Sequence, residues 1–141
     1  MPIEFHSVQN GMGRIWLCRG ILTGRELIAN NERILDSKSY EGVRWLLIDE
    51  TETTMDISTE EIRAIRRQDD RLAAVLPELV TAVVVPYDVG FGMTRMWEIL
   101  TERPGWSTRA FRTRPEAEAW LREEVRRKFG IEMPENLSPP E

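Results

Sequence analysis

The chain has 141 residues, of which 41% are hydrophobic and 30% are charged, and this balance is typical of one globular domain. Its net charge of −5 argues against nonspecific nucleic-acid binding, which depends on positive potential. The single cysteine, Cys18, excludes an intrachain disulfide and fits a reducing compartment. Because we find no apolar run long enough to span a membrane and no signal-peptide pattern, we expect a cytoplasmic protein.

Strand-like apolar runs recur along the chain. They lie at residues 3–8, 14–20, 43–48, 80–85 and 106–112. The Asn10-Gly11 pair between the first two runs is a tight-turn signal and predicts an antiparallel hairpin. The runs at 43–48 and 80–85 are almost continuously apolar, as expected for central strands covered on both faces. The last run is more polar, which favours a place near an edge of the sheet.

Helical patterns follow every run except the first. They are expected at residues 24–35, 59–75, about 90–103 and 114–128. Three begin with a capping box, in which a hydroxyl accepts from the backbone N–H three residues on and a glutamate reaches back. These boxes are Thr23-Gly24-Arg25-Glu26, Ser58-Thr59-Glu60-Glu61 and Thr113-Arg114-Pro115-Glu116.

The order of these elements is β-β-α-β-α-β-α-β-α, and it predicts the fold class. Crossovers through helices require parallel pairing, so we expect a single α/β domain over residues 1–130. Its mixed, mostly parallel sheet should have about five strands, with four helices and an N-terminal antiparallel hairpin. Residues 131–141 contain three prolines and no periodicity, which predicts a mobile tail.

Ligands of open α/β sheets gather at the carboxyl ends of parallel strands, so we expect a site at this rim of the sheet. The residues expected there after the two central strands are Asp49, Glu50, Asp56 and Ser58, then Tyr87, Asp88, Phe91, Thr94 and Arg95, with Trp97 in the helix that follows. The stretch 51–54 is expected to be a loop among them. A helix start at residues 90–94 could bind an anionic group with help from Arg95. Alternatively, Thr94 only caps the helix and Arg95 pairs with a nearby carboxylate.

Other readings of these residues stay open. Phe91 and Trp97, with the methionines between them, could line an apolar pocket or a partner groove, or could simply pack against the sheet. Asp49 and Asp56 could act as paired carboxylates in a small enzyme. Pro2 could act as the amine base of a tautomerase-like enzyme. We expect no metal or cofactor, because His6 is the only histidine and Cys18 has no partner thiol.

Several segments, in this order, resemble the SpoIIAA-like branch of the STAS fold over about residues 3–128. They are Gly20-Ile21-Leu22-Thr23, Leu46-Leu47-Ile48-Asp49, Ser58-Thr59-Glu60-Glu61-Ile62-Arg63, Phe91-Gly92-Met93-Thr94-Arg95-Met96-Trp97-Glu98, and Phe111 followed by Ala117-Glu118-Ala119-Trp120-Leu121. STAS domains share their broad architecture with anti-sigma factor antagonists and, more loosely, with lipid-binding SEC14-type domains. The resemblance implies a small bacterial protein that acts by binding.

In phosphorylated anti-sigma antagonists, a serine followed by a small residue and glycine opens the helix after the central strand. Ser58 has the comparable position here and is a candidate phosphosite. The sequence departs from that pattern, because the acidic residues Asp56, Glu60 and Glu61 surround Ser58 and would repel phosphate.

The leading hypothesis is therefore a non-enzymatic, STAS-like regulatory or binding protein. It would engage a protein partner or a small amphipathic or anionic ligand at the carboxyl rim of the sheet and the third helix. The alternative is a small enzyme that uses rim carboxylates or Pro2. No nucleic-acid partner is expected, and an exposed edge strand leaves a homodimer open.

Overall fold

The computed structural model describes residues 3–100, 102 and 104–137, and within them the chain forms one five-stranded sheet. The strands stand side by side in chain order: β1 (Ile3–Val8), β2 (Gly13–Thr23), β3 (Trp45–Asp56), β4 (Leu79–Val84) and β5 (Trp106–Phe111). β1 is antiparallel to β2, and every other neighbouring pair is parallel. The predicted hairpin and the mixed, mostly parallel sheet are confirmed.

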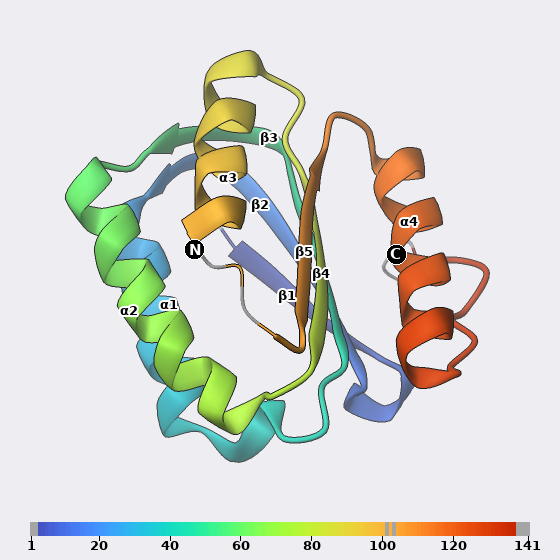
Figure 1. Cartoon of the computed structure of the whole chain (residues 1–141). Coiled ribbons are helices and arrows are strands. Elements are labelled where there is room, and N and C mark those ends of the chain that lie inside the picture. The colour runs from blue at the N-terminus through green and yellow to red at the C-terminus, as the bar shows by residue number, and fades with distance from the viewer. Residues whose placement is uncertain (1–2, 101, 103, 138–141) are drawn as a thin grey trace.

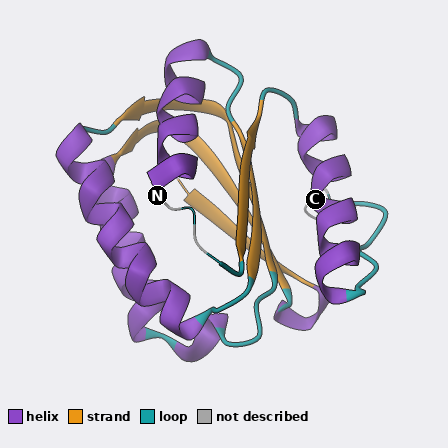
Figure 2. Cartoon of the chain, viewed as in Figure 1, coloured by secondary structure: helices purple, strands orange, loops and turns teal. Residues whose placement is uncertain are grey.

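Helices cover both faces of this sheet (Figure 1). The four are α1 (Gly24–Asp36), α2 (Thr59–Val75), α3 (Asp88–Leu100) and α4 (Arg114–Phe129). The first three lie on one face, and α4 lies alone on the other, as Figure 2 also shows. Single 3-10 turns follow β1 (Gln9–Gly11) and precede β3 (Lys38–Tyr40). None of the described helices is long and apolar enough to cross a membrane.

The predicted N-caps begin three of the helices. Thr23 Oγ1 accepts a hydrogen bond from the Glu26 backbone N–H at 3.2 Å, and Thr113 caps α4 in the same way. The predicted capping box is complete at α2, where Ser58 Oγ accepts from the Glu61 N–H at 3.1 Å and Glu61 Oε1 accepts from the Ser58 N–H at 2.9 Å. At α1 and α4 the structure has the bond to the cap hydroxyl and not the bond to the glutamate carboxylate. These bonds satisfy backbone donors that a helix start would otherwise leave free.

β3 is longer than the sequence predicted, and the expected loop at 51–54 is wrong. Beyond Asp49, where its pairing with β4 ends, β3 continues in parallel beside β2 as far as the pair Thr23↔Asp56. The β2–β3 register shifts once, between Leu17 and Arg19. β2 supplies hydrogen-bond partners for the polar stretch, and threonine suits an extended backbone, so the stretch stays in the sheet.

The sheet separates two apolar cores. One lies under α1, α2 and α3, and the other lies under α4. The indole of Trp45 is fully buried in the second core and lies directly over Gly13. A Cβ at position 13 would be 2.0 Å from that ring, so only glycine fits this place.

The segment after α4 turns back across the second core. Met133 and Leu137 are buried in it, although residues 131–141 were expected to form a mobile tail. Arg122 on α4 donates to the backbone carbonyl of Glu135 at 2.7 Å, and Arg114 donates to that of Leu137 at 2.8 Å. As far as residue 137 this segment therefore packs on the domain without regular secondary structure. Residues 138–141 lie outside the described residues.

Candidate ligand-binding site

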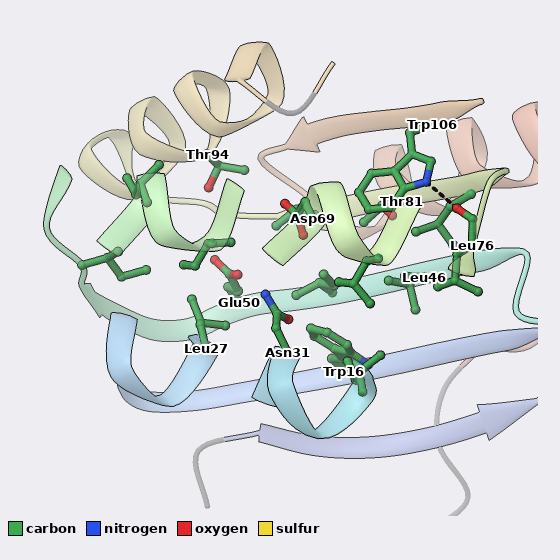
Figure 3. A pocket seen from close by; sticks show the side chains of 18 of the residues that line it. Trp16, Leu27, Asn31, Leu46, Glu50, Asp69, Leu76, Thr81, Thr94 and Trp106 are labelled. Atoms are coloured by element: carbon green, nitrogen blue, oxygen red, sulfur yellow. Dashed lines mark hydrogen bonds between the residues drawn. The ribbon is translucent and has the colours of Figure 1, made fainter. Parts of the chain in front are cut away.

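An apolar pocket of about 130 Å³ lies between the sheet and the helices α1, α2 and α3 (Figure 3). Its apolar walls include Leu27, Ile34, Leu46, Ile48, Ile62, Ile65, Leu72 and Val83. Hydrogen bonds hold the aromatic rings in the wall: Trp16 Nε1 donates to the Tyr40 hydroxyl at 3.0 Å, and Trp106 Nε1 donates to the Leu76 carbonyl at 2.7 Å. Aromatic walls fixed in this way preform a cavity of defined shape.

Glu50 places a carboxyl group in this apolar pocket. Side chains alternate between the faces of a strand, so Glu50 points to the same side of β3 as Leu46 and Ile48. The residue is only 5% exposed, and its Oε2 has no hydrogen-bond partner among the described residues. Burial, and secondarily the negative charge of Asp49, raises the pKa of Glu50 to about 8. Glu50 is therefore largely protonated at neutral pH.

Polar side chains from all three covering helices point into the same pocket as Glu50. Asn31 comes from α1, Asp69 from α2 and Thr94 from α3, and Figure 3 shows them around Glu50 in one part of the cavity. All three are buried, and Asn31 Nδ2 donates to Gln68 Oε1 at 3.1 Å. None of the described residues that line the pocket is basic. The cavity thus combines an apolar body with one acidic, hydrogen-bonding end.

Asp49 and Asp56, the predicted carboxylate pair, lie apart. Asp49 faces α4, where its Oδ2 is 3.1 Å from Arg114 Nη1. Asp56 is exposed at the far end of β3, seven residues further along. At about 3.3 Å per residue, about 23 Å of strand separates them. The structure does not bring these two carboxylates together, because the intervening residues form strand rather than loop.

The predicted residues of the rim have different surroundings. Thr94 lines the pocket. Tyr87 packs against the first core, where burial, and secondarily the charge of Glu50, raises the pKa of its hydroxyl. Phe91 packs at the edge of the first core, with the Arg112 guanidinium 4.6 Å from its ring centroid. Arg95 is exposed and lies 3.4 Å from Glu98 in the same helix.

The other candidates from the sequence do not line the pocket, or they lie outside the residues that the structure describes. Ser58 is exposed at the start of α2, engaged in its capping box. Met96, one of the methionines for which both packing against the sheet and a partner groove were open, is exposed. The side chain of Trp97 and all of Pro2 lie outside the described residues. Cys18 is buried in β2, and burial raises the pKa of its thiol.

The sequence placed Glu50 only among the residues of the rim and missed Asp69 altogether, although it carries a signal that each faces the pocket. Glu50 continues the alternation of Leu46 and Ile48, so its position in the strand predicts the same face. Asp69 interrupts the apolar stripe of α2 between Ile65 and Leu72, four residues after one and three before the other. A carboxyl group on an apolar stripe is either buried or functional, and here it is buried.

Comparison with known proteins finds no family model and no curated protein that matches this chain. Solved structures do match. An uncharacterised protein of the DUF3478 family from Shewanella loihica PV-4, with a SpoIIAA-like fold, has a TM-score of 0.52 and 19% identity, covering 84% of this chain and 91% of that one.

The anti-sigma factor antagonist SpoIIAA in its unphosphorylated form has a TM-score of 0.52 and 12% identity, covering 85% of this chain and 97% of that one. The phosphorylated form of the Bacillus cell fate determinant SpoIIAA has a TM-score of 0.51 and 14% identity, covering 85% and 99%. At these identities the likeness concerns the path of the backbone. The chain has the SpoIIAA-like fold, as its sequence predicted.

Proposed function

We propose that this chain is a binding protein that holds a small amphipathic ligand in the pocket between the sheet and helices α1 to α3. The observation that carries the proposal is the buried Glu50, whose Oε2 has no partner among the described residues. Leaving a buried polar group unpaired costs about 1–3 kcal/mol. A ligand with a polar head at Glu50 and an apolar body in the cavity would remove that cost.

We further propose a regulatory role in which a protein partner senses the ligand through α3. This helix contributes Met93 and Thr94 to the pocket, while Met96 and Ile99 on it are 37% and 72% exposed. The same element therefore contacts both the cavity and solvent. The likeness to an anti-sigma factor antagonist supports a protein partner, and a cytoplasmic location stays a prediction. A phosphoswitch at Ser58 and a homodimer through an exposed edge strand stay predictions.

Acid–base catalysis by Glu50 is a second candidate function. A carboxyl group with a pKa of about 8 can exchange a proton near neutral pH, as a general acid or base must. This moves the enzymatic alternative from Asp49 and Asp56 to Glu50. Turnover of a bound compound that Glu50→Gln abolishes would favour this function. Unchanged compound recovered after incubation would favour binding alone.

Titration with 1-hexanol, a neutral amphiphile, tests the binding function directly. Chemical shifts of methyl groups in the pocket, such as those of Leu27 and Ile62, report where the probe binds. We expect saturable shifts confined to these and neighbouring residues. The absence of saturable binding, or shifts spread over the surface, would contradict the proposal.

Two methionines of α3 offer a matched pair of variants. Met93 lines the pocket, and Met96, one turn along, is exposed. Met93→Trp should fill the cavity and abolish 1-hexanol binding, whereas Met96→Trp should leave it intact. Both variants must keep the far-ultraviolet circular dichroism of the parent protein. Equal binding by the two variants would place the ligand elsewhere.

A further inference from the structure

We propose that the ligand of this pocket carries a cationic amine, which binds between Glu50 and Asp69, and a compact apolar body. This inference rests on the proposed function and names its ligand class. It departs from the anionic ligand that the sequence suggested. The pocket, the unpartnered Glu50 oxygen and the second buried carboxyl group carry it together.

The charges around Glu50 favour a cation. Among the described residues, the titratable groups that act on Glu50 or share its pocket are Asp49 in its own strand, Cys18 on β2, Tyr40 before β3, Asp69 on α2 and Tyr87 after β4. Each of these groups is neutral or negative. The covering helices α1 and α3 contribute the neutral Asn31 and Thr94 to the lining. An anionic ligand would find no basic partner among the described lining residues and would face two carboxyl groups.

The hydrogen-bonding groups also suit an amine. An alkylammonium group has three N–H donors and no acceptor. The carboxyl groups of Glu50 and Asp69 and the hydroxyl of Thr94 come from three different elements and can accept. Asn31 already donates its amide N–H to Gln68. The acidic end of the cavity therefore offers oxygen acceptors from several directions.

The volume of the pocket limits the apolar body. A cavity of about 150 Å³ holds one benzene molecule, and this one measures about 130 Å³. The apolar body of the ligand should therefore have no more than about six carbon atoms. Partly exposed Met55, Ile57 and Met93 line the pocket between the end of β3 and α3, where a ligand would enter.

Binding of an amine should release a proton. At neutral pH Glu50 is largely protonated, and the ammonium ion pairs best with the carboxylate. Affinity for the amine should therefore rise with pH until Glu50 is ionised near pH 8. It should then stay level until the amine itself loses its proton near pH 10.4. The affinity for a neutral ligand of the same shape should not rise with pH in this way.

Calorimetric titration with n-hexylamine and 1-hexanol tests the inference at pH 6, 7, 8 and 9. For a group of pKa 8, affinity for hexylamine should rise about fiftyfold between pH 6 and pH 8 and less than threefold above that. Glu50→Gln should remove the rise, and Asp69→Asn should weaken hexylamine binding more than 1-hexanol binding. Glu60→Gln changes an exposed carboxylate on α2 and is the matched control. It should change neither the affinity for hexylamine nor the affinity for 1-hexanol.

The two proposals fail in different ways. If 1-hexanol binds in the pocket but hexylamine binds no tighter and shows no dependence on pH, the cationic ligand is wrong and the binding function stands. If neither probe binds at any pH, both proposals are wrong. If hexylamine binds with the same pH dependence to Glu50→Gln, the amine does not bind at Glu50 and the inference is overturned.

Discussion

Asp49 and Glu50 are consecutive residues of β3, yet their carboxyl groups lie on opposite faces of the sheet. Asp49 faces α4, with its Oδ2 3.1 Å from Arg114 Nη1. Glu50 faces the pocket beneath α1, α2 and α3. The alternation of a β-strand separates them. One carboxyl group thus has a cationic partner, and the Oε2 of the other has no partner among the described residues.

Glu50 should make the protein less stable as the pH rises from 5 to 8. Its pKa in the folded state, about 8, lies above the value of 4.5 in the unfolded chain, so folding favours the protonated form. The stabilisation that comes from protonated Glu50 is fully present below pH 4.5. Above it, the free energy of unfolding falls by up to about 1.4 kcal/mol per pH unit until pH 8.

Urea unfolding of Glu50→Gln at several pH values isolates this effect. The free energy of unfolding of the variant should not decline with pH. The difference between variant and parent should therefore shift in favour of the variant by a few kcal/mol between pH 5 and pH 8. Glu32, Glu61 and Glu132 have pKa values lowered below 4.5, so the stability that they add is complete before this window. A constant difference between variant and parent would refute the raised pKa.

Arg114 should be important for stability because it joins three parts of the fold. It contacts Asp49 on β3, Glu118 on α4 and the carbonyl of Leu137, and its side chain is only 21% exposed. Arg114→Met should destabilise the protein by on the order of 2 kcal/mol, because partly buried oxygens lose their donors. Arg63→Met, at an exposed position of α2, should cost less than about 0.5 kcal/mol. Equal losses in chemical denaturation would contradict this role.

Gly13 should tolerate no side chain. A Cβ there would be 2.0 Å from the buried Trp45 ring, so Gly13→Ala should cost several kcal/mol or prevent folding. A Cβ at Gly92 in α3 would meet only open space, and Gly92→Ala should stabilise the helix by roughly 0.5–1 kcal/mol. Thermal unfolding of the two variants compares them directly. If Gly13→Ala lowers the stability only slightly, the ring of Trp45 can move aside.

The segment after α4 should stabilise the domain. Leu137 is 2% exposed in the core under α4, so Leu137→Ala should cost about 2–4 kcal/mol. Glu135→Ala, which changes an exposed side chain close by, should be nearly neutral. If both substitutions are neutral, residues 131–137 do not hold this position in solution, and the predicted mobile tail is right.

Ser58 should act first as a helix cap. Ser58→Ala should lower stability by about 1 kcal/mol, because the Glu61 N–H loses its acceptor, while Thr59→Ala should change it less. Mass spectrometry of protein from its native cells tests the separate prediction of phosphorylation. Phosphate on Ser58 would establish the site. Its absence in several growth states would argue against a phosphoswitch.

The sequence by itself determined the order of elements and the starts of three helices. Caps such as Thr23 and Ser58 act on backbone groups within a few residues, so local sequence suffices to place them. The apolar strands then required helical crossovers, and these led to the SpoIIAA-like fold.

Only the tertiary structure decided where the site lies. The polar stretch after Asp49 stays extended because β2 pairs with it. The residues of the stretch itself do not indicate that β2 will lie beside them. Glu50 and Asp69 are nineteen residues apart in the sequence, on β3 and α2, and line one cavity only because α2 packs over the sheet. A shared cavity depends on long-range packing, which local patterns of residues do not specify.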